Sequence, residues 1–239
     1  INYYIQQAFE SKTSEIPEDL ASFVNYSSLI NMLDFKRTDF NKQIALTPKN
    51  FNPIISQYKS YKLSALFDEI KNGKNVNQND SKGKFRVTRI ETIADETINL
   101  NATKWTNDTI KKEDFLISGD ILFSHINSVK HLAKTAIVTD ELDLAHGINL
   151  LRFRANKKKI IPNYAYQIFN LPEFKNEIKA QAQKAVNQAS VNSTYLKELK
   201  IPLPPNKIQT KIVKECQVID QEKEKAVQSA EKGKTEIEK

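Results

Sequence analysis

The sequence predicts an α/β (α+β) fold, in which a mixed-sheet domain is followed by one long C-terminal helix. Short apolar stretches, several with strand-like alternation, are separated by polar loops through the middle of the chain, whereas residues 206–239 carry a sparse heptad pattern. Between these parts, Pro202, Pro204 and Pro205 prevent a helix over 202–205. We therefore expect a helical connector at 1–58, the mixed domain at 59–205 and the helix at 206–239.

Composition restricts the class of protein. A chain of 239 residues can bury a core, and no apolar run approaches the roughly 18 residues that cross a bilayer, so no membrane segment is expected. Cys216 is the only cysteine, which excludes an internal disulfide and a cysteine-based zinc site and favours a reducing, cytoplasmic setting. The chain begins at Ile1 and not at a methionine, which suggests an internal fragment or a processed chain, and its start has no signal-peptide pattern.

The excess of positive charge is concentrated in the middle of the chain. Residues 61–205 carry 22 basic and 16 acidic side chains, whereas the whole chain has a net charge of +7. A polyanion would therefore bind there, although an ordinary soluble surface accounts for this charge about as well.

Before the mixed domain we expect a helix within 1–24, a short helix and a loop at 27–47, and a linker at 48–53. The mixed domain should open at Tyr61-Lys62-Leu63 and continue with a short helix through Phe67 and Ile70, which ends at the Asn72-Gly73 turn. A strand follows at 85–90, and Lys104 and Trp105 lie in a loop.

The second half of the domain has clearer signals. A Gly119-Asp120 turn leads into an apolar strand at 121–124, and further strands are expected at 133–139 and 148–153. Pro162 should begin one helix and Leu171-Pro172-Glu173 should end it, before a second helix over 174–185. A polar loop at 188–192 and a short amphipathic turn then lead to the prolines.

The C-terminal helix carries apolar residues at heptad spacing. Such a sparse seam needs a partner helix in the same or another molecule, and a solvated terminal helix is the less favoured alternative. The positions expected to face a partner helix are Ile212, Cys216, Ile219, Ala226 and Ala230.

No catalytic or metal-binding motif is present. The chain has no glycine-rich phosphate loop, no metal-binding spacing around its three histidines, and no Asn-Pro-Pro-aromatic tetrapeptide of the amino-methyltransferases. We therefore expect no catalytic residue, no metal ligand and no cofactor in this chain.

Four polar and basic clusters predict a nucleic-acid interface. Lys and Arg contact phosphates, Arg can read guanine, and Asn or Gln can read adenine, although each of these residues is also an ordinary loop or surface residue. The first cluster is Lys84, Arg86 and Arg89, next to Lys82, and the second is Lys104 with Trp105. The third is Ser124, His125, Asn127, Ser128, Lys130 and His131, and the fourth is Lys184, Asn187, Gln188, Ser190 and Asn192.

An ordered series of motifs resembles a known family. The segments I-S-G-D-I-L-F-S (117–124), N-L-L-R-F (149–153), Q-A-S-V-N (188–192) and I-P-L-P-P (201–205), with Gln209 and Ile212-Val213, are similar to the specificity (S) subunit of type I restriction-modification systems. Asn187 departs from the glycine common at that position.

The resemblance implies a target recognition domain that reads one half of a bipartite site in double-stranded DNA, followed by a conserved spacer helix that forms a coiled coil and carries methyltransferase subunits. A restriction subunit joins such complexes, and S-adenosylmethionine, ATP and magnesium are expected only in the partner subunits.

Family members usually have two recognition domains and two spacers, whereas one of each is visible here. The chain is therefore either a half subunit, which could form a homodimer through its C-terminal helix, or a piece of a longer chain. The block L-D-F-K-R (33–37) with I-A-L-T-P-K (44–49) resembles the connector of polypeptides that fuse a methyltransferase to its specificity region.

Two other functions remain open. A protein-binding adaptor would use the middle domain to recognise another protein, and its charge would be incidental. An intrinsic nuclease or methylase is disfavoured by the missing motifs.

Overall fold

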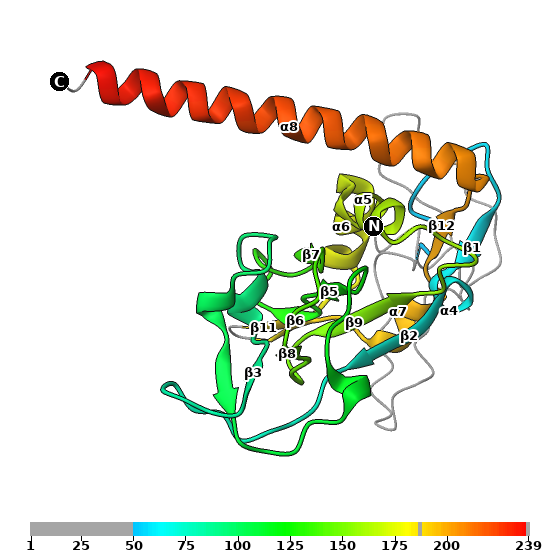
Figure 1. Ribbon diagram of the computed structural model, residues 1–239. Helices are drawn as coiled ribbons and strands as arrows, with labels where there is room; N and C mark the ends of the chain where they lie inside the picture. The colour runs from blue at the N-terminus through cyan, green and yellow to red at the C-terminus, as the bar shows by residue number, and fades with distance from the viewer. Residues whose placement is uncertain (1–49, 186–187, 238–239) are drawn as a thin grey trace, which may run out of the picture. The chain divides into compact units, whose positions relative to one another are not determined.

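The computed structural model describes residues 50–185 and 188–237 (Figure 1). The helices expected within 1–24 and 27–47 lie outside the described residues. No helix in the described part is long and apolar enough to span a membrane.

A four-stranded sheet with the order β2-β9-β5-β7 forms the centre of the described unit, and all of its neighbouring strands are antiparallel. Its strands are β2 (Phe67–Asn72), β5 (Ile121–Phe123), β7 (Thr135–Ile137) and β9 (Leu151–Ala155). Strands β5 and β7 lie within the strands expected at 121–124 and 133–139, and β9 overlaps the one expected at 148–153 but extends to Ala155. Gly119 has a φ of 93°, a conformation that favours glycine, and this explains the turn before β5.

The helix expected through Phe67 and Ile70 is wrong. Helix α4 spans only Leu63–Leu66, and the chain then enters β2. Phe67 and Ile70 are both buried although they lie three residues apart, because a bulge between Phe67 and Glu69 shifts the register against β9. The bulge thus gives a strand a spacing that is typical of a helix.

Gly73 has a packing role where we expected a helix-ending turn. A Cβ atom at Gly73 would lie 2.1 Å from the carbonyl oxygen of His146, which is far inside any real contact. The adjacent amide of Lys74 donates to the same carbonyl oxygen at 2.8 Å. Glycine therefore lets the chain after β2 approach the His146 backbone.

A second sheet has the order β4-β3-β8. Its strands are β3 (Phe85–Val87), β4 (Lys104–Thr106) and β8 (Leu144–Ala145). The strand expected at 85–90 is confirmed over its first half, and 90–93 form the 3-10 helix η1 (Ile90–Ile93). Lys104 and Trp105 lie on a strand instead of the expected loop, because β3 supplies hydrogen-bonding partners to a segment too short to show strand periodicity.

Two further 3-10 helices, η2 (Leu100–Ala102) and η3 (Lys112–Asp114), lie on either side of β4 in the chain. The third sheet has the order β10-β11-β6 and contains β6 (Ile126–Asn127), β10 (Gln183–Ala185) and β11 (Gln188–Ser190). Part of the loop expected at 188–192 is thus a strand, and the helix expected to reach 185 is too long. It ends at Ala180, because the following residues pair in this sheet.

Helix α5 (Pro162–Asn170) begins at Pro162, as expected. Helix α6 (Pro172–Ala180) begins at Pro172 and not at the expected Phe174, because proline suits the first turn of a helix. Phe169 packs between the central sheet and α6: its ring centroid lies 5.0 Å from that of Phe153 and 4.8 Å from that of Phe174. Helix α7 (Ser193–Glu198) corresponds to the expected amphipathic turn.

The proline-rich segment joins the unit to the C-terminal helix. Strands β1 (Ser60–Lys62) and β12 (Lys200–Pro202) pair antiparallel, and α8 (Asn206–Ile237) follows. Gln209, almost fully buried, accepts a hydrogen bond from the Ile161 amide and donates to the Pro204 carbonyl oxygen, both at 2.9 Å. The start of α8 is therefore fastened to the start of α5 (Figure 1).

The positions of α8 that we expected to face a partner helix differ in their exposure. Ile212 packs against the core of the same chain, and Cys216 is half-buried. Ile219 is 62% exposed, and Ala226 is exposed as well. The side chain of Ala230 lies outside the description. Only the positions after Cys216 are thus open to a partner helix, and the coiled coil stays a prediction.

Candidate nucleic-acid interface

The first two candidate clusters lie on the sheet β4-β3-β8. Arg86 on β3 is directly opposite Trp105 on β4, and Lys104 is opposite Val87. The guanidinium carbon of Arg86 lies 5.0 Å from the centroid of the Trp105 ring. Directly opposed side chains share one face of a sheet, so strand pairing brings these two clusters together.

The lysines of this sheet differ in their partners. Lys84 is exposed, and its Nζ lies 5.2 Å from the centroid of the Phe85 ring. Lys104 is half-buried and forms an ion pair with Asp80. Lys84 is therefore the more accessible of the two for a phosphate.

Arg89 lies where β3 gives way to η1. Its Nη1 donates to Gln78 Oε1 at 3.0 Å, and its Nε lies 3.8 Å from a carboxylate oxygen of Glu91. The Nε atom is buried and has no hydrogen-bond partner among the described residues. Arg89 is thus largely engaged within the protein.

The third cluster is the segment from Ser124 to His131, which contains β6. Ser124 is 1% exposed, whereas Lys130 is exposed and His131 is half-buried. The Asn127 Nδ2 donates to Ser124 Oγ at 3.3 Å, and its Oδ1 accepts from the Ser128 amide at 2.8 Å. The Asn127 amide is therefore held in one orientation, and each of its polar atoms keeps capacity for one more hydrogen bond.

The fourth cluster pairs with the third. Ser190 on β11 is opposite Ile126 on β6, and it is half-buried. Lys184 lies on β10 and Gln188 on β11, and for both the structure describes the backbone position only. Asn187 lies outside the described residues. Segments more than 50 positions apart in the sequence thus form one small sheet.

Asn192 has a local role at the start of α7. Its side-chain oxygen accepts a hydrogen bond from the Thr194 amide at 2.8 Å, which is a helix N-cap. The neighbouring Val191 amide donates to the His125 carbonyl oxygen at 2.8 Å. Asn192 is exposed and follows directly on the third sheet.

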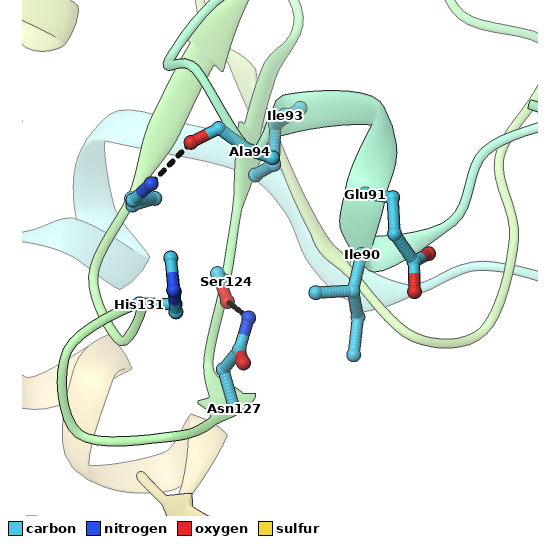
Figure 2. Close-up of a pocket in the computed structure, with 8 residues that line it drawn as sticks. Ile90, Glu91, Ile93, Ala94, Ser124, Asn127 and His131 are labelled. Atoms are coloured by element: carbon cyan, nitrogen blue, oxygen red, sulfur yellow. Dashed lines mark hydrogen bonds between the residues drawn. The ribbon is translucent and has the colours of Figure 1, made fainter. Parts of the chain in front are cut away.

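Two open cavities connect these clusters. The first, of about 250 Å³, separates Ser124, Asn127 and His131 from η1, as Figure 2 shows. Lys134 also lines it and donates a hydrogen bond to the Ala94 carbonyl oxygen. The second cavity, of about 330 Å³, is lined by Arg89, Lys104 and residues 101–103. Glu91 lines both cavities, so the clusters form one series of neighbouring surfaces.

His125 is buried next to this surface. It is 5% exposed, and its Nε2 lies 3.2 Å from Asn72 Nδ2, so the amide donates and the imidazole accepts. Burial lowers the pKa of His125 to about 4. At neutral pH this histidine is therefore uncharged and offers no positive charge to a phosphate.

His146 is buried as well, with an exposed fraction of 1%. Its Nε2 donates to the Leu150 carbonyl oxygen at 2.9 Å. Burial, and then the positive charge of Arg152, lower the pKa of His146 to about 3. It belongs to the core and not to the interface.

Two arginines that contribute to the positive charge of the domain are used internally. Arg152 is fully buried and forms an ion pair with Glu69. Arg154 donates to both carboxylate oxygens of Asp120, at 2.8 Å and 2.7 Å. Each pair engages one basic and one acidic side chain, so the net charge surplus is unchanged, but fewer arginines are available to a ligand than the sequence suggests.

Sequence reasoning missed several residues of this region. Asn72 orients His125, while Glu91 and Lys134 line the cavity of Figure 2. Asn72 reaches the site through the pairing of β2 with β9, and Lys134 and Glu91 come from segments next to the third cluster and η1. Nothing in their local sequence marks them as neighbours. Among the described residues, no three His, Cys, Asp or Glu side chains are placed to hold a metal ion.

Comparison with known proteins identifies the family. The family model of the type I restriction modification DNA specificity domain matches residues 41–231. The chain is 42% identical over 180 residues to a putative type I restriction enzyme MjaX specificity subunit of Methanocaldococcus jannaschii, covering 73% of this chain and 42% of that protein. It is 23% identical over 171 residues to the type I restriction enzyme EcoKI specificity subunit of Escherichia coli K12, covering 70% and 37%. The chain thus spans less than half the length of these relatives.

Solved structures show the same fold. The HsdS subunit from Thermoanaerobacter tengcongensis matches with a TM-score of 0.52 at 16% identity, over 71% of this chain and 43% of that one. A chain from a structural study of complex assembly and conformational transition of the type I R-M system matches with a TM-score of 0.53 at 16% identity, over 71% and 40%. Since the family model covers well over half of its residues, this chain belongs to the type I restriction modification DNA specificity domain family.

Proposed function

We propose that this chain reads a DNA sequence for a type I restriction-modification complex and performs no catalysis itself. One observation carries the proposal: four polar and basic stretches, separated in the sequence, become neighbours through the pairs β3–β4 and β6–β11 and the two cavities beside η1. A concentration of hydrogen-bond donors and positive charge at one surface is what duplex recognition requires.

The two types of contact would come from different residues. Lys84 and Lys130 are exposed and suit phosphate oxygens, which supply affinity but no sequence preference. Arg86, Asn127 and His131 are half-buried, and the side chains of Arg86 and Asn127 are also held by neighbours, which suits contacts with base edges.

The single recognition unit and the single long helix of the described residues suggest how much of a target they read. One recognition unit followed by one helix would read one half of a bipartite site, and the domain limits we propose are 1–58, 59–205 and 206–239. Helix α8 would pair with a second helix as a coiled coil, in a homodimer or in a longer chain, and would position the methyltransferase and restriction subunits. S-adenosylmethionine, ATP and magnesium would bind to those partners, in the cytoplasm.

Selection from randomised duplexes tests the proposal. We expect the full chain, alone or assembled with its methyltransferase subunit, to enrich a short half-site. Its binding constant should also fall with salt, with a slope of about −0.9 per phosphate contact on a log–log plot. A protein-binding adaptor would show little duplex binding at any salt concentration. Binding that is indifferent to sequence even in the assembled complex would contradict the proposal.

Substitution of Ile219 by aspartate tests the helix. Val218 and Ile219 are 53% and 62% exposed, and a charge there should prevent apolar pairing while leaving the mixed unit folded. We expect Ile219→Asp to abolish dimerisation or methyltransferase binding, measured by size-exclusion chromatography with light scattering. Ile212 is unsuitable because it packs against the core.

Gln217→Asp is the matched control for the helix. Gln217 is exposed and lies about 200° around the helix from Ile219. The Gln217→Asp variant therefore places the same negative charge on the opposite side of the helix. Assembly that is equal in the two variants would count against pairing through Ile219.

A further inference from the structure

The Arg86–Trp105 pair has the properties of a pre-positioned reading group. The two residues are directly opposed on β3 and β4, and the indole supports the guanidinium from one side at 5.0 Å. Arg86 Nη1 also lies 3.5 Å from the Leu100 carbonyl oxygen, at the limit of a hydrogen bond. Stacking on an aromatic ring restricts the plane of an arginine and leaves the hydrogen-bonding edge of its fork available.

The charge of Arg86 is not neutralised within the described part of the chain. The other arginines there, Arg89, Arg152 and Arg154, each have a carboxylate oxygen within 4 Å. For Arg86 the described residues provide no carboxylate partner, although its side chain is half-buried. A half-buried cation in this position is well placed for an external acceptor.

The neighbouring lysines do not combine these properties. Lys104 is neutralised by its ion pair with Asp80, and Lys84 is exposed. The ammonium group of a lysine is a point charge that any phosphate oxygen satisfies, whereas the fork of an arginine matches two adjacent acceptors in one plane. On duplex DNA, the O6 and N7 atoms of guanine form such a pair of acceptors in the major groove.

We propose that Arg86 reads a guanine in the recognised half-site and that Trp105 is the residue that positions it. This inference rests on the proposed function, because it assigns one specificity contact within the same interface. Trp105 acts through Arg86: the indole keeps the guanidinium plane in the orientation that two parallel N–H···acceptor bonds require. The alternative source of acceptors is a backbone phosphate, which would give Arg86 affinity without base preference.

The experiment compares half-sites selected by the full chain and by Arg86→Lys, Trp105→Phe and Trp105→Ala. Arg86→Lys keeps the charge but loses the fork. We expect it to lose preference for guanine at one position by about tenfold, with the other positions unchanged. Trp105→Ala should weaken the preference at the same position, and Trp105→Phe should restore part of it because it keeps an aromatic face.

Lys84→Ala is the control, because we expect it to lower affinity uniformly across sequences and to reduce the salt slope by about one. If Arg86→Lys enriches the same half-site as the unmodified chain, or weakens all sequences equally, the guanine contact is overturned. Thermal unfolding of each variant shows whether the fold is intact. If the fold is intact, a guanine preference that is weakened in Trp105→Ala and partly restored in Trp105→Phe indicates loss of positioning of Arg86. If the unmodified chain itself enriches no half-site, the proposed function fails and not only this contact.

Discussion

Replacing Asp120 by alanine is expected to lower the free energy of unfolding by about 3–5 kcal/mol, the largest effect of a single substitution that we predict. Asp120 is fully buried and accepts hydrogen bonds from Arg154 and from the Ile117 amide, at 3.0 Å for the latter. Alanine would remove the carboxylate that accepts two hydrogen bonds from the Arg154 guanidinium, and it would leave the Ile117 amide without its acceptor. A buried polar group that loses its partner is destabilising, because water cannot reach it to form the hydrogen bond instead.

Urea unfolding measures this effect, and Asp140→Ala is its control. Asp140 is exposed, so its substitution removes the same charge without opening a buried network. We expect the midpoint of Asp120→Ala to fall steeply at an unchanged slope, and that of Asp140→Ala to move little. A difference below about 1 kcal/mol between the two variants would show that the Asp120 network adds little to stability.

Acidification from pH 7.5 to pH 5.0 is expected to destabilise the fold by about 2 kcal/mol for each of the two buried histidines. The pKa values of His125 and His146 fall from 6.5 to about 4 and about 3 on folding. Between those values and 6.5 the unfolded chain therefore binds more protons than the folded one. The free energy of unfolding thus decreases as the pH falls, and this loss is absent above about pH 7.5.

Denaturant unfolding at both pH values checks the prediction. His146→Gln replaces an imidazole by an amide that can still donate a hydrogen bond to the Leu150 carbonyl oxygen. This variant should lose about 2 kcal/mol less than the unmodified chain between the two pH values. Thr135→Val is the control: it removes a buried hydroxyl, but no titratable group, and should lower stability equally at both. A His146→Gln variant with unchanged pH dependence would refute the assignment.

The fold was predictable where local sequence sets the backbone. Gly119-Asp120 marks the entry to β5, Pro162 begins α5, and the proline-rich segment separates α7 from α8. Pro172 ends α5 as expected, but it also begins α6, which we expected only from Phe174. Glycine and proline restrict the backbone without reference to distant residues, so their positions can be interpreted directly.

The predicted secondary structure was wrong where pairing with a distant strand determines the backbone conformation. Phe67 and Ile70 have helical spacing but lie on a bulged strand against β9, and Trp105 became part of a strand through β3. A local sequence pattern does not reveal which distant strand a segment will pair with, and strand pairing overrides the local preference of the segment.

In the candidate site, too, local sequence predicted some features and distant contacts decided others. Composition alone selects stretches with Lys, Arg, Asn and Ser, and these proved to be neighbours. It could not show that His125 is buried and uncharged, or that Asn192 caps α7. Both outcomes depend on which segments cover or follow the residue in space.

The sequence by itself determined the Gly119-Asp120 turn, the starts of α5 and α8, the excess of positive charge in the middle of the chain and the ordered motifs of the specificity-domain family. Only the tertiary structure decided which charges are available. Arg152 and Arg154 are paired with Glu69 and Asp120, whereas Arg86 is held against Trp105 without a carboxylate partner in the described part of the chain. The physical reason is that a charge is buried and neutralised, or left for a ligand, by neighbours that the fold brings from distant parts of the chain.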